Sequence, residues 1–113
     1  MGKYTEERPW GKFEQFCCNE AVTVKIITVK PNSKLSLQYH NYRDEFWKVI
    51  EGTGQIVLGD QTIDVKVGDE FIISKKISHR IITTGTVLKV MEISFGKFDE
   101  KDIVRLEDEY KRK

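Results

Sequence analysis

The spacing of apolar residues constrains the fold of this chain more than any other feature. Short apolar segments alternate with turns rich in Gly, Asn and Asp along most of the length. This alternation is typical of β-strands joined by tight turns. The strands that we predict cover residues 13–18, 22–29, 34–40, 45–50, 55–58, 61–67, 70–74, 80–84 and 86–94. Many short strands in succession indicate an all-β sandwich or barrel.

The C-terminal segment is the one place where the spacing favours a helix. Ile103, Leu106 and Tyr110 recur at intervals of three and four residues, and Asp102 precedes them as a candidate cap. We therefore expect a short helix at this end of the chain, although the segment is highly charged.

Length and charge set the limits of the organisation and of the partners. With 113 residues and 39% apolar residues, the chain has material for one core, so residues 1–113 are predicted to form a single domain. The formal net charge is only +1, which disfavours nucleic acid as a partner. No apolar run is long enough to span a membrane, and the charged N-terminus lacks a secretory signal, so we expect a cytoplasmic protein.

The two histidines are the strongest candidates for chemistry. His40 and His79 each lie at the boundary of a predicted strand. Gln38 lies two residues before His40, so both side chains share one face of their strand. Glu45 begins the next strand. If these two strands pair antiparallel, all three side chains can point to one place. Imidazole, carboxylate and amide groups together suit Zn, Ni, Fe, Mn or Co without selecting one. The alternative is that both histidines are structural and form ordinary hydrogen bonds.

Four segments in order resemble a known family. The stretch LSLQYHNYRDEFWKVIEG (residues 35–52) resembles the first cupin motif, in the form found in type II phosphomannose isomerases, and residues 68–83 resemble the second motif. RPWG at residues 8–11 and DIVRLEDEY at residues 102–110 are similar to further segments of that family. The resemblance covers almost the whole chain.

This resemblance implies a double-stranded β-helix, or jelly-roll barrel, around one divalent metal ion. Its ligands would be Gln38, His40, Glu45 and His79. The implied activity is a metal-dependent aldose–ketose isomerase that interconverts mannose 6-phosphate and fructose 6-phosphate, or a related phosphosugar. The family also suggests a homodimer. Relatives are often fused to a sugar-1-phosphate guanylyltransferase domain, but these residues contain no Gly-rich nucleotide loop, so we do not expect nucleotidyl transfer from them alone.

The sequence departs from the family pattern at several positions. Ser74 and Lys76 stand where the second motif usually has Pro and Gly, and Thr83 replaces Asn. Asn32 replaces a turn Gly, and Asn tolerates the positive φ that such a turn needs. The metal ligands are retained, so the departures concern substrate specificity.

An isomerase of this kind needs a base and an anchor for phosphate. Glu92 interrupts an apolar strand, and burial in the barrel would raise its pKa toward that of a general base. Its alternative place is the outer face, paired with a Lys. Arg43 lies between two ligands and is the candidate for phosphate and for catalysis, or else it pairs with Asp44. Trp47 either walls the substrate pocket or belongs to the core.

The N-terminal RPWG segment carries one further expectation. Trp10 lies between Pro9 and Gly11, and we expect it to cover the open end of the barrel.

Other functions stay open on the sequence. The chain could be a non-catalytic cupin that binds a sugar or metabolite, a nucleotide-sugar isomerase or epimerase, or an Fe(II) cupin oxygenase. Gln38 disfavours the oxygenase, since those cupins generally have His at this position.

Overall fold

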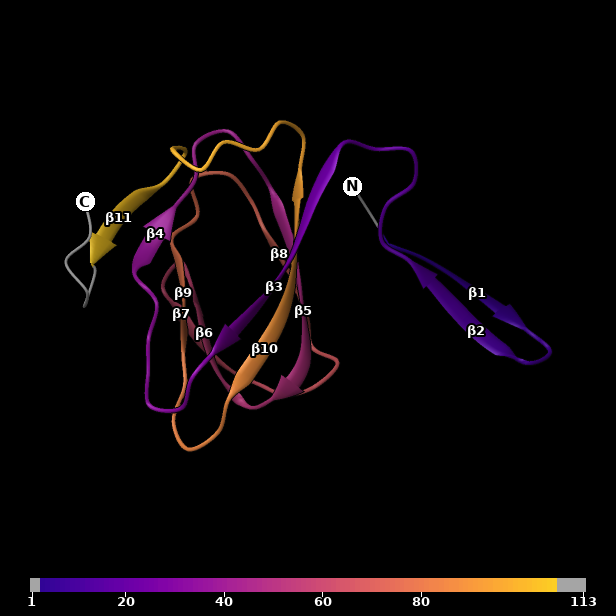
Figure 1. Ribbon diagram of the computed structural model, residues 1–113, viewed down its shortest axis with the longest axis horizontal. Helices are drawn as coiled ribbons and strands as arrows, with labels where there is room; N and C mark the ends of the chain where they lie inside the picture. Colours follow the sequence, from indigo (N-terminus) through magenta and orange to yellow (C-terminus); the bar gives the residue numbers. More distant parts are fainter. Residues whose placement is uncertain (1–2, 108–113) are drawn as a thin grey trace.

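Two antiparallel β-sheets face each other around one core, and a hairpin projects from one side (Figure 1). The computed structural model describes residues 3–107. The four-stranded sheet has the order β3 (Val22–Val29), β10 (Leu88–Phe95), β5 (Glu45–Gly52) and β8 (Glu70–Ile73). The five-stranded sheet has the order β11 (Val104–Glu107), β4 (Leu37–Tyr39), β9 (His79–Ile82), β6 (Gly54–Leu58) and β7 (Gln61–Val65). The projecting hairpin consists of β1 (Tyr4–Arg8) and β2 (Gly11–Gln15).

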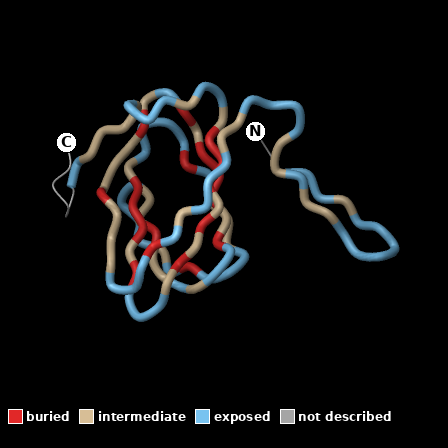
Figure 2. Tube along the Cα trace, in the orientation of Figure 1, coloured by how far each residue is buried: buried red, intermediate tan, exposed pale blue. Residues whose placement is uncertain are grey.

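Alternating residues of both sheets form the core. In β5, Trp47 and Val49 point inward and are buried, as are Leu88 and Val90 in β10. Ile81 meets them from the opposite sheet and is also fully buried. Figure 2 shows the buried positions gathered along the facing strands of the two sheets, while the hairpin has none. Period-two burial of this kind is what a sandwich of two sheets requires.

The predicted all-β fold is confirmed, with adjustments at strand ends. β3 has the predicted limits, and β5 to β10 lie within a few residues of theirs. The predicted strand over 34–40 is mostly loop, since only Leu37–Tyr39 forms β4 and Lys34 makes an isolated bridge to Ile82. β1 was not predicted because its sequence, YTEER, shows no alternation of apolar and polar residues.

The predicted C-terminal helix is wrong for the residues that the structure describes. Val104–Glu107 forms β11, which pairs with β4. Pairing with the edge of the sheet gives the backbone amides and carbonyls of this segment hydrogen-bond partners. A short, highly charged helix near the chain end would be only marginally stable. Tyr110, the third residue of the proposed helical stripe, lies outside the described residues. Within residues 3–107 there is no helix long and apolar enough to cross a membrane.

The expected position of Trp10 is also wrong. It lies in the turn between β1 and β2, which is the tip of the hairpin that projects in Figure 1. Its side chain is 72% exposed. The hairpin is attached to the body at its base, where Phe16 packs on Phe46 with ring centroids 5.3 Å apart. Trp10 therefore points into solvent in the single chain and does not cover the barrel.

Candidate metal centre

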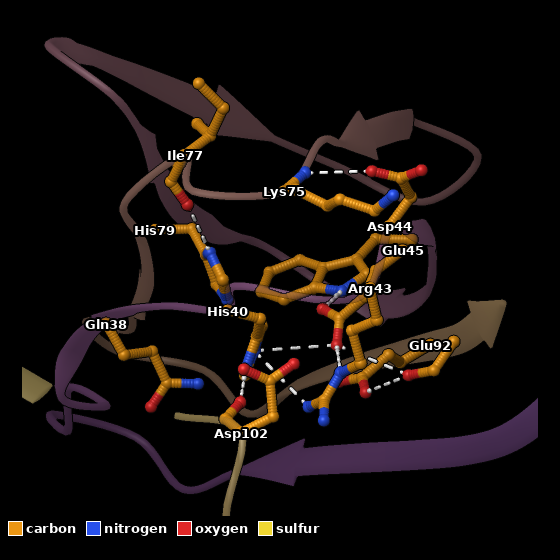
Figure 3. Close-up of polar contacts among 12 residues, drawn as sticks. Gln38, His40, Arg43, Asp44, Glu45, Lys75, Ile77, His79, Glu92 and Asp102 are labelled. Atoms are coloured by element: carbon orange, nitrogen blue, oxygen red, sulfur yellow. Dashed lines mark hydrogen bonds and ion pairs between the residues drawn. The ribbon is translucent and has the colours of Figure 1, made fainter. Parts of the chain in front are cut away.

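His40, Glu45 and His79 converge inside the barrel (Figure 3). One potential ligand atom from each lies within 4.8 Å of the others, and all three side chains are at most 3% exposed. His40 follows β4, Glu45 begins β5 and His79 begins β9. The expectation that neighbouring antiparallel strands carry Gln38, His40 and Glu45 is wrong, because β4 and β5 belong to opposite sheets. The short connection between them crosses the barrel, and this crossing brings the ligand candidates face to face.

Backbone carbonyls orient both imidazoles. His40 Nδ1 lies 2.6 Å from the Asp102 carbonyl oxygen, and His79 Nδ1 lies 3.0 Å from that of Ile77. A carbonyl only accepts hydrogen bonds, so each Nδ1 carries the proton and each Nε2 keeps its lone pair. His79 Nε2 is buried and has no hydrogen-bond partner among the described residues. A buried nitrogen left in this way fits a metal ligand, because the other ring nitrogen is already fixed.

Glu45 is held as a carboxylate. Its Oε1 accepts a hydrogen bond from Trp47 Nε1 at 3.0 Å, and its Oε2 accepts one from Arg43 Nε at 2.8 Å. Burial alone would raise the pKa of Glu45, but the hydrogen bond from Arg43 and the positive charge of Arg43 hold it below the ordinary value. Burial lowers the pKa of His79, which favours neutral imidazole. Neutral imidazole and carboxylate are the forms that bind a divalent ion.

Gln38 lies near this group, because in the β4–β9 register it stands directly opposite His79. Its Oε1 accepts a hydrogen bond from Ser36 Oγ at 2.6 Å. The role of Gln38 as a fourth ligand stays a prediction.

Arg43 is buried and engaged on several sides. Besides Glu45, it donates through Nη1 to the Asp99 carbonyl at 3.2 Å and through Nη2 to His40 Nε2 at 3.3 Å. Its guanidinium also lies 4.5 Å from the centre of the Phe98 ring. Its carboxylate partner is Glu45, whereas Asp44 accepts from the backbone amide of Lys75. A metal bound at His40 Nε2 would replace one of these Arg43 contacts.

Glu92 faces the interior from β10. It is 6% exposed, and the alternative of an outer-face Glu paired with Lys is not what the structure shows. Burial, with the neighbouring Glu45 charge next in importance, raises the pKa of Glu92 to about 7. Ser94 Oγ donates to Glu92 Oε1 at 3.2 Å and to Glu45 Oε2 at 3.3 Å, so one hydroxyl joins the two carboxyl groups. A catalytic role for Glu92 stays a prediction.

A cavity of about 400 Å³ opens beside His40, the one of the three ligand candidates that lines it. Its polar lining includes Lys25, Gln38, His40, Arg43, Glu92 and Arg105. Trp47 does not line it, since this side chain is 2% exposed and packs edge-on against His79 with ring centroids 5.4 Å apart. Trp47 therefore supports Glu45 and His79 from the core side, which is the second of its two expected roles.

Asp102 is a residue of this site that the sequence did not reveal. Its carboxylate accepts hydrogen bonds from the backbone amides of Asn41 at 2.8 Å and Tyr42 at 3.0 Å, while its carbonyl holds His40 (Figure 3). Asp102 thus fixes the loop after β4 and not the start of a helix. No sequence signal separates these two roles, since an Asp can cap either kind of segment.

Comparison with known proteins identifies relatives for nearly the whole described chain. Residues 3–108 match the family model described as "Mannose-6-phosphate isomerase C-terminal". Xanthan biosynthesis protein XanB of Xanthomonas campestris is 37% identical over 93% of this chain and 23% of its own length. Mannose-1-phosphate guanylyltransferase 2 of Escherichia coli O157:H7 is 38% identical over 92% of this chain and 22% of its own. The chain thus spans less than a quarter of the length of these relatives.

The solved structures support the fold. The capsular polysaccharide assembling protein CapF of Staphylococcus aureus superposes with a TM-score of 0.66, at 20% identity, over 95% of this chain and 33% of that one. At this identity the likeness concerns the fold alone, and it confirms the predicted cupin double-stranded β-helix.

The comparisons also correct the predicted activity. Interconversion of mannose 6-phosphate and fructose 6-phosphate is contradicted, because the matched relatives are named for mannose-1-phosphate guanylyltransferase or for xanthan and alginate biosynthesis. These names point to sugar-nucleotide synthesis. Together, the fold, the His–Glu–His group and the match over residues 3–108 show that the chain belongs to the cupin family described as mannose-6-phosphate isomerase C-terminal.

Proposed function

We propose that this cupin domain holds one divalent metal ion and binds a phosphorylated mannose derivative within sugar-nucleotide synthesis. The observation that carries the proposal is the buried Nε2 of His79, which lies beside His40 and Glu45 and has no hydrogen-bond partner within residues 3–107. These three residues would hold the ion, with Gln38 as the further oxygen ligand. The ligand set suits Zn, Ni, Mn, Co or Fe, and the ion would polarise an oxygen of the bound ligand.

Cationic side chains outnumber carboxyl groups in the lining of the adjoining cavity, which favours an anionic ligand. Lys25, Arg43 and Arg105 contribute the cationic groups, and Glu92 and Glu100 contribute the carboxyl groups. Lys25 Nζ lies 4.3 Å from the centre of the Phe98 ring, near the guanidinium of Arg43 on the same ring. Phosphate recognition by cationic side chains beside an apolar ring is well suited to a sugar phosphate. Glu92 offers a carboxyl that can hydrogen-bond a sugar hydroxyl. The relatives' printed names supply mannose 1-phosphate as the first ligand to test.

Calorimetric titration with mannose 1-phosphate tests this function. We expect binding to the metal-loaded protein and weaker or no binding after chelation. Lys25→Gln should weaken binding by roughly ten- to a hundredfold, through loss of one charged contact worth about 1.5–3 kcal/mol. Lys66→Gln is the matched control, because Lys66 is exposed and pairs with Asp69 in a surface turn. Equal binding with and without metal, or equal loss in both variants, would contradict the proposal.

A further inference from the structure

Arg43 contacts two of the atoms that His40 and Glu45 would offer to a metal ion. Its Nε donates to Glu45 Oε2 at 2.8 Å, and Nη2, on the same edge of the guanidinium, lies 3.3 Å from His40 Nε2 (Figure 3). These two acceptor atoms are 3.6 Å apart. Two ligands of a tetrahedral ion, each bound at about 2.1 Å, lie about 3.4 Å apart. The edge of the guanidinium and a metal ion therefore suit the same pair of atoms.

His40 Nε2 can serve only one of these partners at a time. Its ring carries a proton on Nδ1, which lies 2.6 Å from the Asp102 carbonyl oxygen, so Nε2 has a single lone pair. That lone pair either accepts the hydrogen bond from Arg43 or binds an ion. Glu45 Oε2 is also engaged, because it accepts hydrogen bonds from both Arg43 and Ser94. An ion bound at His40 must therefore release Nη2 of Arg43.

This release leaves a charged donor without an acceptor inside the protein. Arg43 is 7% exposed, and within residues 3–107 His40 Nε2 is the acceptor that Nη2 reaches. The rest of the guanidinium stays anchored, since Nη1 donates to the Asp99 carbonyl at 3.2 Å and the centre of the Phe98 ring lies 4.5 Å away. A buried charged donor that loses its partner is costly. Arg43 lines the cavity beside His40, so an anionic oxygen in that cavity can replace His40 as the acceptor.

We propose that Arg43 couples metal binding to ligand binding in this domain. When an ion takes His40 Nε2, the freed Nη2 donates to an anionic oxygen of the ligand in the cavity. Each binding event then strengthens the other, because the ion frees the donor and the ligand removes the cost of freeing it. The inference rests on the metal site and the anionic ligand of the proposed function, and it adds the link between them.

Replacement of Arg43 separates this role from simple support of Glu45. If Arg43 only held the Glu45 carboxylate in place, its loss would weaken metal binding. If Arg43 competes for His40 Nε2 and its positive charge repels the ion, its loss tightens metal binding. The metal affinity thus changes in opposite directions for the two roles.

Competition with a chelating dye tests the proposal, with Zn²⁺ titrated into the full chain in the presence and absence of mannose 1-phosphate. Without the sugar phosphate, Arg43→Met should lower the Zn²⁺ dissociation constant by about threefold or more. Mannose 1-phosphate should lower this constant by about fivefold or more in wild type, and by less than about twofold in Arg43→Met.

Arg80→Met is the matched control. Arg80 is also a buried arginine, at 8% exposed, but its guanidinium pairs with Glu107. It follows His79 directly in β9, so the two side chains point to opposite faces of the sheet. Arg80→Met should therefore not tighten Zn²⁺ binding.

Arg43→Lys keeps the measurement decisive if Arg43→Met does not fold, which circular dichroism shows. Lysine retains the positive charge beside Glu45, but a single ammonium group lacks the fork that spans both ligand atoms. We expect Arg43→Lys also to bind Zn²⁺ more tightly than wild type and to lose most of the effect of mannose 1-phosphate.

The contrary outcomes separate this inference from the proposed function. Weaker Zn²⁺ binding in the Arg43 variants would overturn the inference and leave Arg43 as a support for Glu45, while the metal site stands. A wild-type Zn²⁺ affinity that mannose 1-phosphate does not change, or an equal gain in Arg80→Met, would also overturn it. A wild-type chain that binds no divalent ion would overturn the proposed function as well.

Discussion

At the residue scale, the site depends on side chains that hold other side chains. His40 and His79 present Nε2 to the interior because a backbone carbonyl accepts a hydrogen bond from Nδ1–H of each ring. Trp47, Arg43 and Ser94 orient the Glu45 carboxylate in a similar way, by donating hydrogen bonds to its two oxygens. The sequence identified the three ligand candidates from residue type and motif, but their supports come from distant segments and could not be predicted from spacing.

Asp102 provides a direct test of this support. Asp102→Ala removes the carboxylate that binds the amides of Asn41 and Tyr42, so the loop that carries His40 should loosen. We expect a metal affinity lower by about 10–100-fold, measured by competition with a chelating dye. Asp102→Asn keeps one acceptor oxygen and should recover part of the affinity. Asp60→Ala, in an exposed turn, should have no effect. Equal affinities of Asp102→Ala and wild type would refute this positioning role.

At the element scale, strand identity was far easier to predict than strand partnership. The sequence predicts β3 with its observed limits because this segment is rich in β-branched residues, which favour strands. The sequence does not predict that β4 and β5 lie in opposite sheets, because the residues of a strand do not specify which sheet it joins. β11 was mistaken for a helix because apolar spacing in a short charged segment satisfies both periods.

Turns make a separate contribution to the fold. Asn32 has φ +55°, as expected for a residue that replaces a turn Gly. Gly52 has φ +83°, and a Cβ there would lie 1.8 Å from the Val87 carbonyl oxygen. Gly52→Ala should therefore lower the free energy of unfolding by roughly 1–3 kcal/mol in urea titration. Gly85→Ala is the control, because a Cβ there meets nothing within 4 Å. Similar unfolding midpoints for both variants would show that the turn relaxes freely.

The ion pair between Lys3, at the base of the β1–β2 hairpin, and Glu70 predicts a pH dependence. Burial alone would raise the pKa of Glu70, but hydrogen bonds from Lys48 and Lys3 lower it below the ordinary value. The unfolded chain therefore binds more protons in this range, and the stabilisation by Glu70 is present at neutral pH and lost as pH falls through the carboxyl range. Urea unfolding at pH 6 and at pH 4 should show a smaller decrease in stability for Glu70→Gln than for wild type. Equal decreases would mean that these ion pairs do not stabilise the fold.

At the scale of the whole molecule, the sequence predicts the family correctly but not the activity. The ordered motifs predict the cupin family and fold correctly, because those motifs are the parts of the chain that build the barrel and carry the ligand candidates. The predicted isomerase activity is contradicted by the names of the relatives, of which this chain matches less than a quarter. A fold is shared among many activities, so motifs that specify the barrel do not specify the reaction.

Metal binding should also be visible in the stability of the whole chain. An ion that binds only the folded state stabilises it by about 2.7 kcal/mol at a hundredfold excess over the dissociation constant. We expect Tm to rise with added Zn²⁺ and to return to its starting value after chelation. A Tm that does not respond to any of Zn²⁺, Mn²⁺, Co²⁺, Ni²⁺ or Fe²⁺ would be inconsistent with a metal site in the barrel.

The metal content of the purified protein tests the central claim most directly. After equilibrium dialysis against a divalent metal, elemental analysis should find one ion per wild-type chain and none in His79→Ala. That variant removes the buried nitrogen that has no hydrogen-bond partner in the part of the chain that the structure describes. The control Asn19→Ala, in the exposed loop before β3, should retain the full amount. A wild-type chain without metal, or equal metal in wild type and His79→Ala, would contradict the assignment of this site.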